Sequence, residues 1–463
     1  MKDEISPRSG VLNCEQGGAT FYEENYNFRI MNNHPVENAS TESSFAIIKK
    51  EKNYCSGVTH DGKAIAIYID NFSIPPIKTF FNLYANMYAV QEGNVCIPDW
   101  NKIDAIRFTG GTINQLFHLD QLPYKIIGDA IKPASPKPAF PFIISHGDLN
   151  ITVAIGQMIT QYHSQTDVSI SGRNGYIDLR FSSPISFSDI PFHIEKIKSL
   201  ISFLTFRRNI DFDKIILQKK LPTADVLWDS AFMYLKEFST PTQKAEDNNI
   251  CFEELDVTIF TLMDVIYNEN TNNPFTFMGF IPTTDKEADR TTNDMIKNIV
   301  TCLECEIARL RGSDVELIEP DSKSEVYLAE EKELSALKKG LHSTIKNFQE
   351  EHHCFSKKTS DMLKGTINHM TLADADKIYL LYSNYQDLIC KLFCHLNIKP
   401  TREDIERLII YRNKTTHGTQ EVLDERIVTT AIHLVGLIYC MILHSIGLYD
   451  DDIQKLCMKR FLS

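Results

Sequence analysis

The chain has 463 residues, a length that predicts two or three domains rather than a single core. Hydrophobic residues make up 43% of it and charged residues 24%, proportions that are typical of a soluble globular protein. The formal net charge of -13 excludes a general nucleic-acid coat protein, which needs a basic surface, but leaves room for a nuclease with a local basic site.

The sequence predicts a cytoplasmic protein, with the bacterial cytoplasm as the expected compartment. No apolar run follows the charged residues at the N-terminus, so no signal peptide is expected. The 11 cysteines are then expected to be reduced and mostly buried. The most apolar stretch, residues 429–449, is interrupted by His433 and His444, which favours a buried helix of a soluble domain over a membrane span.

The first half of the chain predicts a β-rich domain over residues 1–240. Its turn signal "RNG" lies between two alternating stretches and predicts a hairpin. The prolines of residues 133–141 predict an irregular connection. The expected elements are strands at 63–69 and 150–160, the hairpin strands 167–172 and 176–181, a helix at 192–206 and a strand at 211–221.

A polar stretch with a proline and no apolar period, residues 237–249, predicts the domain boundary. The chain then becomes helical, and the lengths of the helices and connections indicate an all-α bundle over residues 250–463. The expected fold class is therefore α+β. The predicted helices span residues 293–312, 325–351, 375–397, 401–413 and 423–447.

The stretch "YRNKTTHG", residues 411–418, ends one of these helices with functional side chains. Arg412 continues an apolar stripe that contains Leu408, so it is expected to point toward the bundle or a partner. On an ideal helix Arg412 and His417 would lie about 140° apart, so they converge only if the helix bends. Thr415, Thr416 and Gly418 predict such a bend.

These residues suit RNA cleavage without a metal. The 2′-hydroxyl attacks the neighbouring phosphorus, so a base must accept its proton and an acid must protonate the leaving oxygen. His417 could do either because histidine titrates near neutral pH. Arg412 could hold the phosphate and stabilise its developing charge. Asn413 could orient the histidine or the phosphate, and Lys414 would add positive charge for RNA binding. One histidine cannot easily be acid and base in one step, which favours two subunits.

The motif resembles the signature of the HEPN superfamily (higher eukaryotes and prokaryotes nucleotide-binding), R-x(4–6)-H with a polar residue after the arginine. Gly418 and a long apolar helix that ends in "SIGL" extend the resemblance. Residues 176–206 are similar to the strand, "F-S-P" and helix passage of the N-terminal domain of ApeA-like anti-phage proteins. The chain is thus expected to combine an ApeA-type N-terminal domain with a HEPN helical bundle.

The resemblance implies an endoribonuclease whose active site forms between two HEPN domains of a homodimer. It makes His417 the general acid/base and Arg412 the phosphate-binding residue, supported by Asn413, with no cofactor. It also implies an abortive-infection effector that cuts tRNA or other host RNA once the N-terminal domain senses a phage-derived trigger. A tyrosine shortly after the histidine, found in some relatives, is replaced here by Gly418 and Thr419.

Alternatives remain open for each of these features. Glu304 could face the site from an early helix or simply be a solvated glutamate. Arg412 to His417 could be a helix end whose charges complement the dipole, in a non-catalytic dimerising or nucleotide-binding module with a β-rich receptor domain. The pairs Cys302/Cys305 and Cys390/Cys394 and "EEHHC" at 350–354 are weak metal-binding patterns. A metal-dependent hydrolase could take a His and an Asp from "SHGD" at 145–148, but no further ligands accompany them, and a turn also explains these residues.

Overall fold

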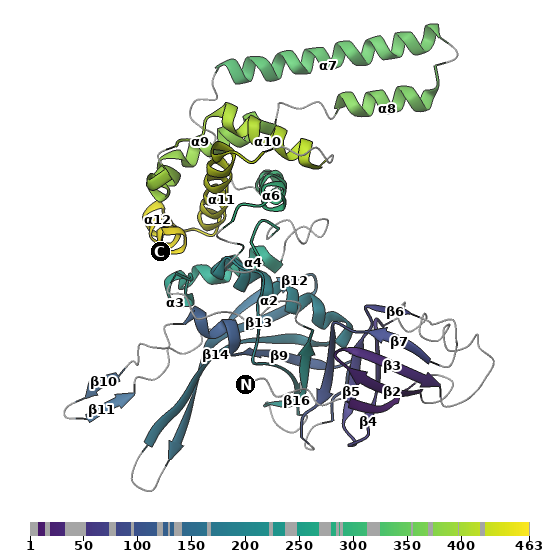
Figure 1. Ribbon diagram of the computed structural model, residues 1–463, viewed down its shortest axis with the longest axis vertical. Coiled ribbons are helices and arrows are strands. Elements are labelled where there is room, and N and C mark those ends of the chain that lie inside the picture. The colour runs from purple at the N-terminus through teal and green to yellow at the C-terminus, as the bar shows by residue number, and fades with distance from the viewer. Residues whose placement is uncertain are drawn as a thin grey trace. The chain divides into compact units, whose positions relative to one another are not determined.

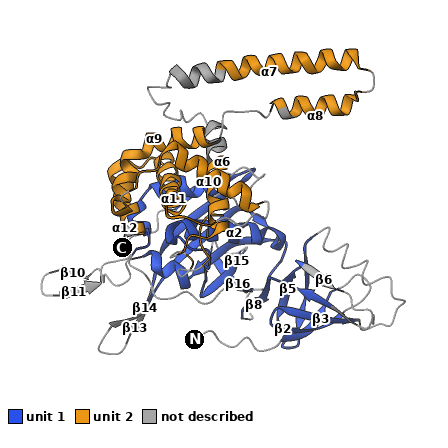
Figure 2. Cartoon of the chain, turned by 45° about the horizontal axis from the view of Figure 1, so that its top comes forward, with its two compact units in different colours: residues 1–268 blue, residues 269–463 orange. Residues whose placement is uncertain are grey.

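The computed structural model describes residues 8–13, 19–32, 52–73, 80–93, 97–117, 124–127, 130–133, 141–163, 168–221, 226–236, 248–267, 279–283, 287, 290–312, 325–352, 355–368, 374–396, 398–416 and 422–462. The chain divides into two compact units, residues 1–268 and residues 269–463 (Figure 2). Unit 1 is built mainly on a β-sheet and unit 2 on helices, so the fold class is α+β, as the sequence predicts.

Fourteen of the described strands of unit 1 form one antiparallel sheet (Figure 1). In the order in which they lie side by side they are β12 (Phe142–His146), β13 (Leu149–His163), β14 (Val168–Ile185), β9 (Ile103–Thr109), β15 (Lys214–Lys220), β16 (Leu227–Leu235), β8 (Met87–Gln91), β5 (Ala64–Tyr68), β4 (Tyr54–Thr59), β1 (Arg8–Leu12), β2 (Ala19–Glu24), β3 (Asn27–Asn32), β7 (Phe80–Tyr84) and β6 (Asn71–Ser73). A separate hairpin pairs β10 (Tyr124–Ile127) with β11 (Ala130–Pro133).

The N-terminal strands enclose a core of their own. Buried and exposed residues alternate along β2, the pattern of a strand with one face on a core and the other in water. The rings of Phe28 and Tyr88 meet edge to face at 5.4 Å. The buried side chains of this core are Leu12, Ala19, Phe21, Phe28, Ile30, Cys55, Ile65, Ile67, Ile69, Leu83, Ala85, Tyr88 and Val90.

The hairpin predicted around "RNG" is wrong, because those residues lie inside the single long strand β14. Asn174 and Gly175 pair with β13, and it is β13 and β14 that form the antiparallel pair. Gly175 serves a close approach instead of a turn. Its N–H donates to Asn114 Oδ1 at 2.7 Å, and a Cβ at this position would lie 2.6 Å from the ring of Phe117. Both contacts come from η1 (Gly111–Leu116) and the residue after it.

The other expected elements of unit 1 agree with the structure. The strands predicted at 63–69, 150–160 and 211–221 correspond to β5, β13 and β15, and the helix predicted at 192–206 to α2 (Ile190–Thr205). The Pro-rich residues 134–140 lie outside the described residues.

Helix α2 packs on the sheet and on α4 (Thr258–Tyr267). The ring of His193 lies 4.8 Å from that of Phe181 on β14, and burial lowers the pKa of His193 to about 3. The Lys196 ammonium donates to the carbonyl of Ile266 at 2.6 Å, which places a cation at the negative end of α4. Helices α3 (Phe252–Leu255) and α4 therefore belong to unit 1, and the units divide at 268/269, whereas the sequence places the boundary between 240 and 250.

Unit 2 is helical, as predicted. The helices expected at 293–312 and 325–351 have those bounds, and the others shift by up to five residues. Helices α8 and α12 are additional to those predicted. The described helices of this unit are α6 (Asn293–Gly312), α7 (Glu325–Glu351), α8 (Lys357–Asn368), α9 (Asp374–Leu392), η3 (Cys394–Leu396), α10 (Arg402–Thr416), α11 (Glu425–Ser445) and α12 (Asp450–Leu462).

Helix α11 is the core of unit 2. It is long and apolar enough to cross a membrane. However, 83% of its most apolar 18-residue stretch is buried within the protein, and the helix packs against α6, α9, α10 and α12. Such burial is typical of the core helix of a soluble domain, the reading that the sequence favours. His433 faces this core, and its Nδ1 lies 3.0 Å from the hydroxyl of Tyr382 on α9.

The glycine inside β14 yields a first prediction. Gly175→Ala adds a Cβ that clashes with Phe117, so we expect the free energy of unfolding of unit 1 to fall by about 1–3 kcal/mol. Both tryptophans of the chain, Trp100 and Trp228, lie in unit 1, so urea denaturation followed by their fluorescence measures this change. Asn174→Ala, at an exposed neighbouring position, is the matched control. Equal stabilities of the two variants would contradict the assigned role of Gly175.

The buried histidine of α11 yields a second prediction. Burial lowers the pKa of His433 to about 4, against about 6.5 in the unfolded chain. The contribution of the neutral His433 ring to the free energy of unfolding is thus complete above pH ~6.5. It is lost as the pH falls toward about 4, because the unfolded chain then binds one proton more than the folded chain. Urea denaturation of unit 2, followed by helical circular dichroism, should show a shallower pH dependence for His433→Asn than for the original chain. The same slope for both would show that His433 is not buried as a neutral ring.

Candidate functional site

Helix α10 carries the motif and begins with a capping box. The backbone N–H and the hydroxyl of Thr401 both donate to Asp404 Oδ2, at 3.0 and 2.9 Å, and the Asp404 N–H donates back to Thr401 Oγ1 at 3.3 Å. Burial alone would raise the pKa of Asp404, but the hydrogen bonds from Thr401 and the ion pair with Arg426 hold it below its usual value. The start of α10 is therefore firmly set.

The end of α10 differs from the prediction, because the helix continues through both threonines. Thr415 Oγ1 donates to the carbonyl of Tyr411 at 2.9 Å, and Thr416 Oγ1 donates to that of Arg412 at 2.7 Å. These bonds to the preceding turn satisfy the hydroxyls inside a helix, so β-branching does not end it here. The expected bend therefore does not occur between Arg412 and Thr416.

Arg412 faces inward, as the apolar stripe predicts. Ile405 and Leu408 are fully buried on the same face, and the Arg412 side chain is only 22% exposed. Its Nη2 lies 2.6 Å from Glu304 Oε1 on α6, and its Nε is buried without an acceptor. Glu304, whose side chain is 36% exposed, is thus the ion-pair partner of Arg412.

A second contact helps to fix α10 across α6. Tyr411 is only 1% exposed, and its hydroxyl donates to Asn293 Oδ1 at 2.5 Å. Asn293 and Glu304 lie about 16 Å apart along α6, since a helix rises about 1.5 Å per residue. Two adjacent side chains of α10 therefore bind positions of α6 that lie three turns apart, and both contacts hold α10 to that helix.

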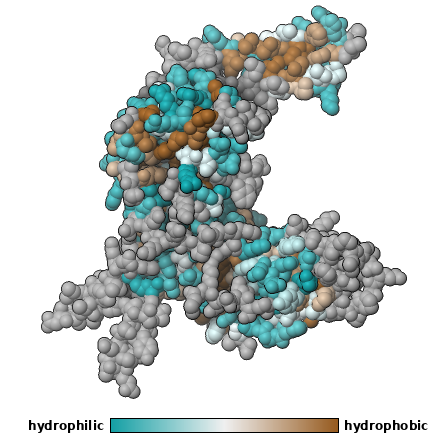
Figure 3. All heavy atoms as spheres, viewed as in Figure 1, coloured by the Kyte–Doolittle hydropathy of each residue, from teal (hydrophilic) through white to brown (hydrophobic). Residues whose placement is uncertain are grey.

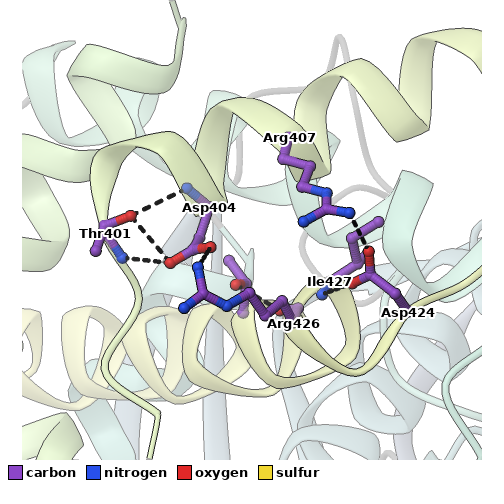
Figure 4. A network of polar contacts seen from close by, with 7 residues as sticks. Thr401, Asp404, Arg407, Asp424, Arg426 and Ile427 are labelled. Atoms are coloured by element: carbon purple, nitrogen blue, oxygen red, sulfur yellow. Dashed lines mark hydrogen bonds and ion pairs between the residues drawn. The ribbon is translucent and has the colours of Figure 1, made fainter.

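Two ion pairs fasten the start of α11 to the first half of α10 (Figure 4). Arg426 Nη1 lies 3.1 Å from Asp404 Oδ1, and Arg407 Nη2 lies 2.6 Å from Asp424 Oδ2. The other oxygen of Asp424 caps α11 by accepting the N–H of Ile427 at 2.9 Å. Asp424 and Arg426, at the start of α11, are therefore both held to α10.

Of the remaining predicted site residues, Asn413 and Lys414 are described and His417 is not. Asn413 and Lys414 follow Arg412 on the last turn of α10, and both are exposed. His417 lies outside the described residues, so its distance from Arg412 stays a prediction. The described part of the site is an inward-facing arginine paired with a glutamate, next to an exposed amide and an exposed ammonium.

The patterns considered for metal binding do not form a cluster within the described part of the chain. No three His, Cys, Asp or Glu side chains converge there. "SHGD" is the turn that joins β12 to β13, with Gly147 at φ +57°, and the His146 ring stacks on Phe192 at 4.7 Å. Cys302 is buried in α6, while Cys394 is exposed in η3.

Comparison with known proteins gives no relative. No family model matches the chain, and neither a curated protein nor a solved structure matches it. The resemblance to the HEPN superfamily therefore stays a prediction from the motif and from the setting of Arg412.

The ion pair of the site yields a third prediction. Arg412→Met and Glu304→Gln should each destabilise unit 2, and their coupling in a double-mutant cycle should be about 1 kcal/mol, because both side chains are partly shielded from water. Denaturation followed by helical circular dichroism measures it. The exposed pair Lys346 and Glu350, 4.0 Å apart on α7, is the control and should show a coupling near zero. A coupling no larger than that of the control would mean that the Arg412 contact does not hold α10 to α6.

Proposed function

We propose that the chain is a metal-independent endoribonuclease of the HEPN type that works as a homodimer. The observation that carries the proposal is Arg412, which combines the motif arginine with an inward-facing position at the last turns of α10 and a carboxylate that fixes its guanidinium. An arginine whose side chain is held in place is pre-organised to bind a phosphate, because less conformational freedom is lost on binding.

The chemistry assigns each residue a role. Arg412 presents the N–H groups that Glu304 does not occupy to the scissile phosphate and stabilises the charge that develops on it. Lys414 contacts a neighbouring phosphate from the exposed face, and Asn413 orients the phosphate or the histidine. His417 moves protons between the 2′-hydroxyl and the leaving 5′-oxygen, with a second His417 supplied by the other subunit.

Glu304 is part of the proposed site as a positioning residue. Its carboxylate neutralises Arg412 while no RNA is bound, which keeps a half-buried charge from standing alone. The acidic net charge of the chain agrees with a site of this kind, since binding of RNA would depend on a small local cluster and not on the whole surface.

The biological role follows from the resemblance and rests on it. The protein would act in the bacterial cytoplasm as an abortive-infection effector against phage, cutting tRNA or another host RNA. Unit 1 would be the sensor of a phage-derived trigger. Its large sheet provides a body separate from the helical unit, which suits a division between sensing and cleavage.

A second candidate function is favoured by the same ion pair. Arg412, Tyr411 and their partners on α6 help to hold the bundle together, which is sufficient reason for a non-catalytic module to contain them. In that case unit 2 would dimerise or bind a nucleotide, and unit 1 would be a ligand receptor. The two functions differ over His417, which the catalytic function needs and the structural one does not.

Cleavage by purified variants tests the proposal. The full-length chain is incubated with total bacterial RNA and a chelator, with and without an extract of phage-infected cells as the trigger. We expect Arg412→Ala and His417→Ala each to lose at least about 100-fold in cleavage rate, because phosphate stabilisation and proton transfer are both removed. Lys455→Ala, an exposed change on α12, should cleave at the original rate.

Three outcomes would contradict the proposal. Cleavage by His417→Ala at the original rate would show that His417 is not the acid/base. Absence of cleavage by the original chain in the presence of the trigger would leave the non-catalytic function as the better account. Loss of cleavage in the chelator alone would point to a metal-dependent reaction. Circular dichroism of the variants separates a loss of chemistry from a loss of fold.

A further inference from the structure

The large sheet of unit 1 has a face that turns away from α2 and carries basic side chains. On β14 the ring of Phe181 lies 4.8 Å from that of His193 on α2, so Phe181 faces the helix. Side chains alternate along a strand, and Tyr176, Asp178 and Arg180 therefore point to the opposite face. The pairing of β14, β9 and β15 extends this face to the side chains of Thr109, Arg107 and Ala105, and then to Lys214, Ile216 and Gln218.

Three cations form a diagonal line across this face. Arg180 on β14, Arg107 on β9 and Lys214 on β15 each lie one strand and two residues from the next, which is a step of about 8 Å between Cα atoms. The side chain of Arg180 is 53% exposed and that of Arg107 is 26% exposed, and Lys214 is exposed as well. Cations at regular steps suit a chain of phosphates, in which every unit carries a negative charge.

The charge of this face is positive, although the whole chain carries -13. Of the nine positions on the three strands only Asp178 is acidic, so three cations and one carboxylate leave +2. Asp178 is 1% exposed, accepts two hydrogen bonds of 2.7 Å from Nε and Nη2 of Arg107, and lies 3.6 Å from Arg180. Asp229 on β16 and Lys220 at the end of β15 add one charge of each sign beside them. In the view of Figure 3, hydrophilic atoms predominate on the described strands of unit 1, whereas apolar atoms gather along α7 and α8.

Two aromatic rings lie beside these cations. The guanidinium of Arg107 lies 5.4 Å from the centre of the Tyr176 ring, and the ammonium of Lys214 lies 5.0 Å from that of Phe232 on β16. Both aromatic residues are half-buried, so part of each stays in contact with water. Unpaired bases stack on aromatic rings and guanidinium planes, whereas the bases of a duplex are already stacked on one another.

We propose that this face of unit 1 binds a single strand of RNA. The phosphates follow the line from Arg180 to Lys214, and the bases stack on Tyr176 and Phe232. Asp178 holds Nε and Nη2 of Arg107, which leaves Nη1 to meet a phosphate. The rings favour a nucleic acid over an acidic peptide, which has charges but no bases to stack. The charges and rings suit RNA and DNA alike, and the choice of RNA rests on the proposed ribonuclease function.

Binding of a fluorescent single-stranded RNA of about 12 nucleotides to the full-length chain tests the proposal. All variants carry His417→Ala, so that the RNA stays intact during the measurement. Arg180→Ala and Lys214→Ala should each weaken binding at least about fivefold, and each should reduce the slope of log affinity against log salt concentration by about 0.7, because one phosphate contact is lost. Lys52→Ala is the matched control. It removes the same charge from an exposed turn before β4, four strands from β15, and should leave the affinity unchanged.

A second readout separates stacking from charge. Tyr176→Ala should weaken binding at least about fivefold without changing the salt slope, because a stacked base is lost and no cation is. Tyr22→Ala, at a position 44% exposed on β2, is its control. Arg180→Lys keeps the charge and should keep the salt slope. Urea denaturation followed by the fluorescence of Trp100 and Trp228 shows that unit 1 stays folded in each variant.

Equal affinities for Arg180→Ala, Lys214→Ala and Lys52→Ala would overturn the proposal. So would displacement of the RNA by polyglutamate as effectively as by unlabelled RNA, since it would show a surface for acidic peptides. Tighter binding of a duplex, or of DNA of the same sequence, would overturn the choice of single-stranded RNA. A failure of the proposed ribonuclease function would appear separately, as cleavage of the RNA by the His417→Ala chain.

Discussion

The packing of unit 2 depends on the burial of α11. A helix that is apolar on nearly all sides cannot stay in water, so α6, α9, α10 and α12 must surround it. This requirement decides which face of α10 turns inward, and Arg412 lies on that face one turn after Leu408. A charged side chain on an inward face needs a partner, and α6 supplies it in Glu304 at 2.6 Å. The candidate site is thus a consequence of how the bundle closes around its core helix.

Much of unit 2 could be predicted because helical periodicity is a local property of the sequence. The spacing of apolar residues predicted the observed bounds of α6, and the apolar run of α11 indicated a buried helix. In unit 1 local signals were less reliable. Asn174 and Gly175 have the letters of a turn, but the approach of Phe117 from another element requires the glycine within a strand. The division between the units lies later than the polar linker predicts, because Lys196 and other side chains of α2 hold α4 against the sheet.

The candidate site, too, could be predicted only in part from the sequence. The inward direction of Arg412 could be read from its spacing to Leu408, but its partner Glu304 lies 108 residues earlier, and only the packing of α10 on α6 brings the two together. The sequence also predicts a bend at Thr415 and Thr416 from their intrinsic preferences. Their hydroxyls instead bond to carbonyls of the preceding turn, so the helix continues to the residue before His417.

The central claim is that Arg412 and His417 cut RNA by attack of the neighbouring 2′-hydroxyl. The most direct measurement uses a defined RNA that the protein cleaves and a copy with one 2′-deoxynucleotide on the 5′ side of the scissile phosphate. Mass spectrometry of the products identifies their ends. The account predicts 2′,3′-cyclic phosphate and 5′-hydroxyl ends from the first RNA and no cleavage of the second. Cleavage of the deoxy-substituted RNA at the same position, or products with 5′-phosphate ends, would contradict it.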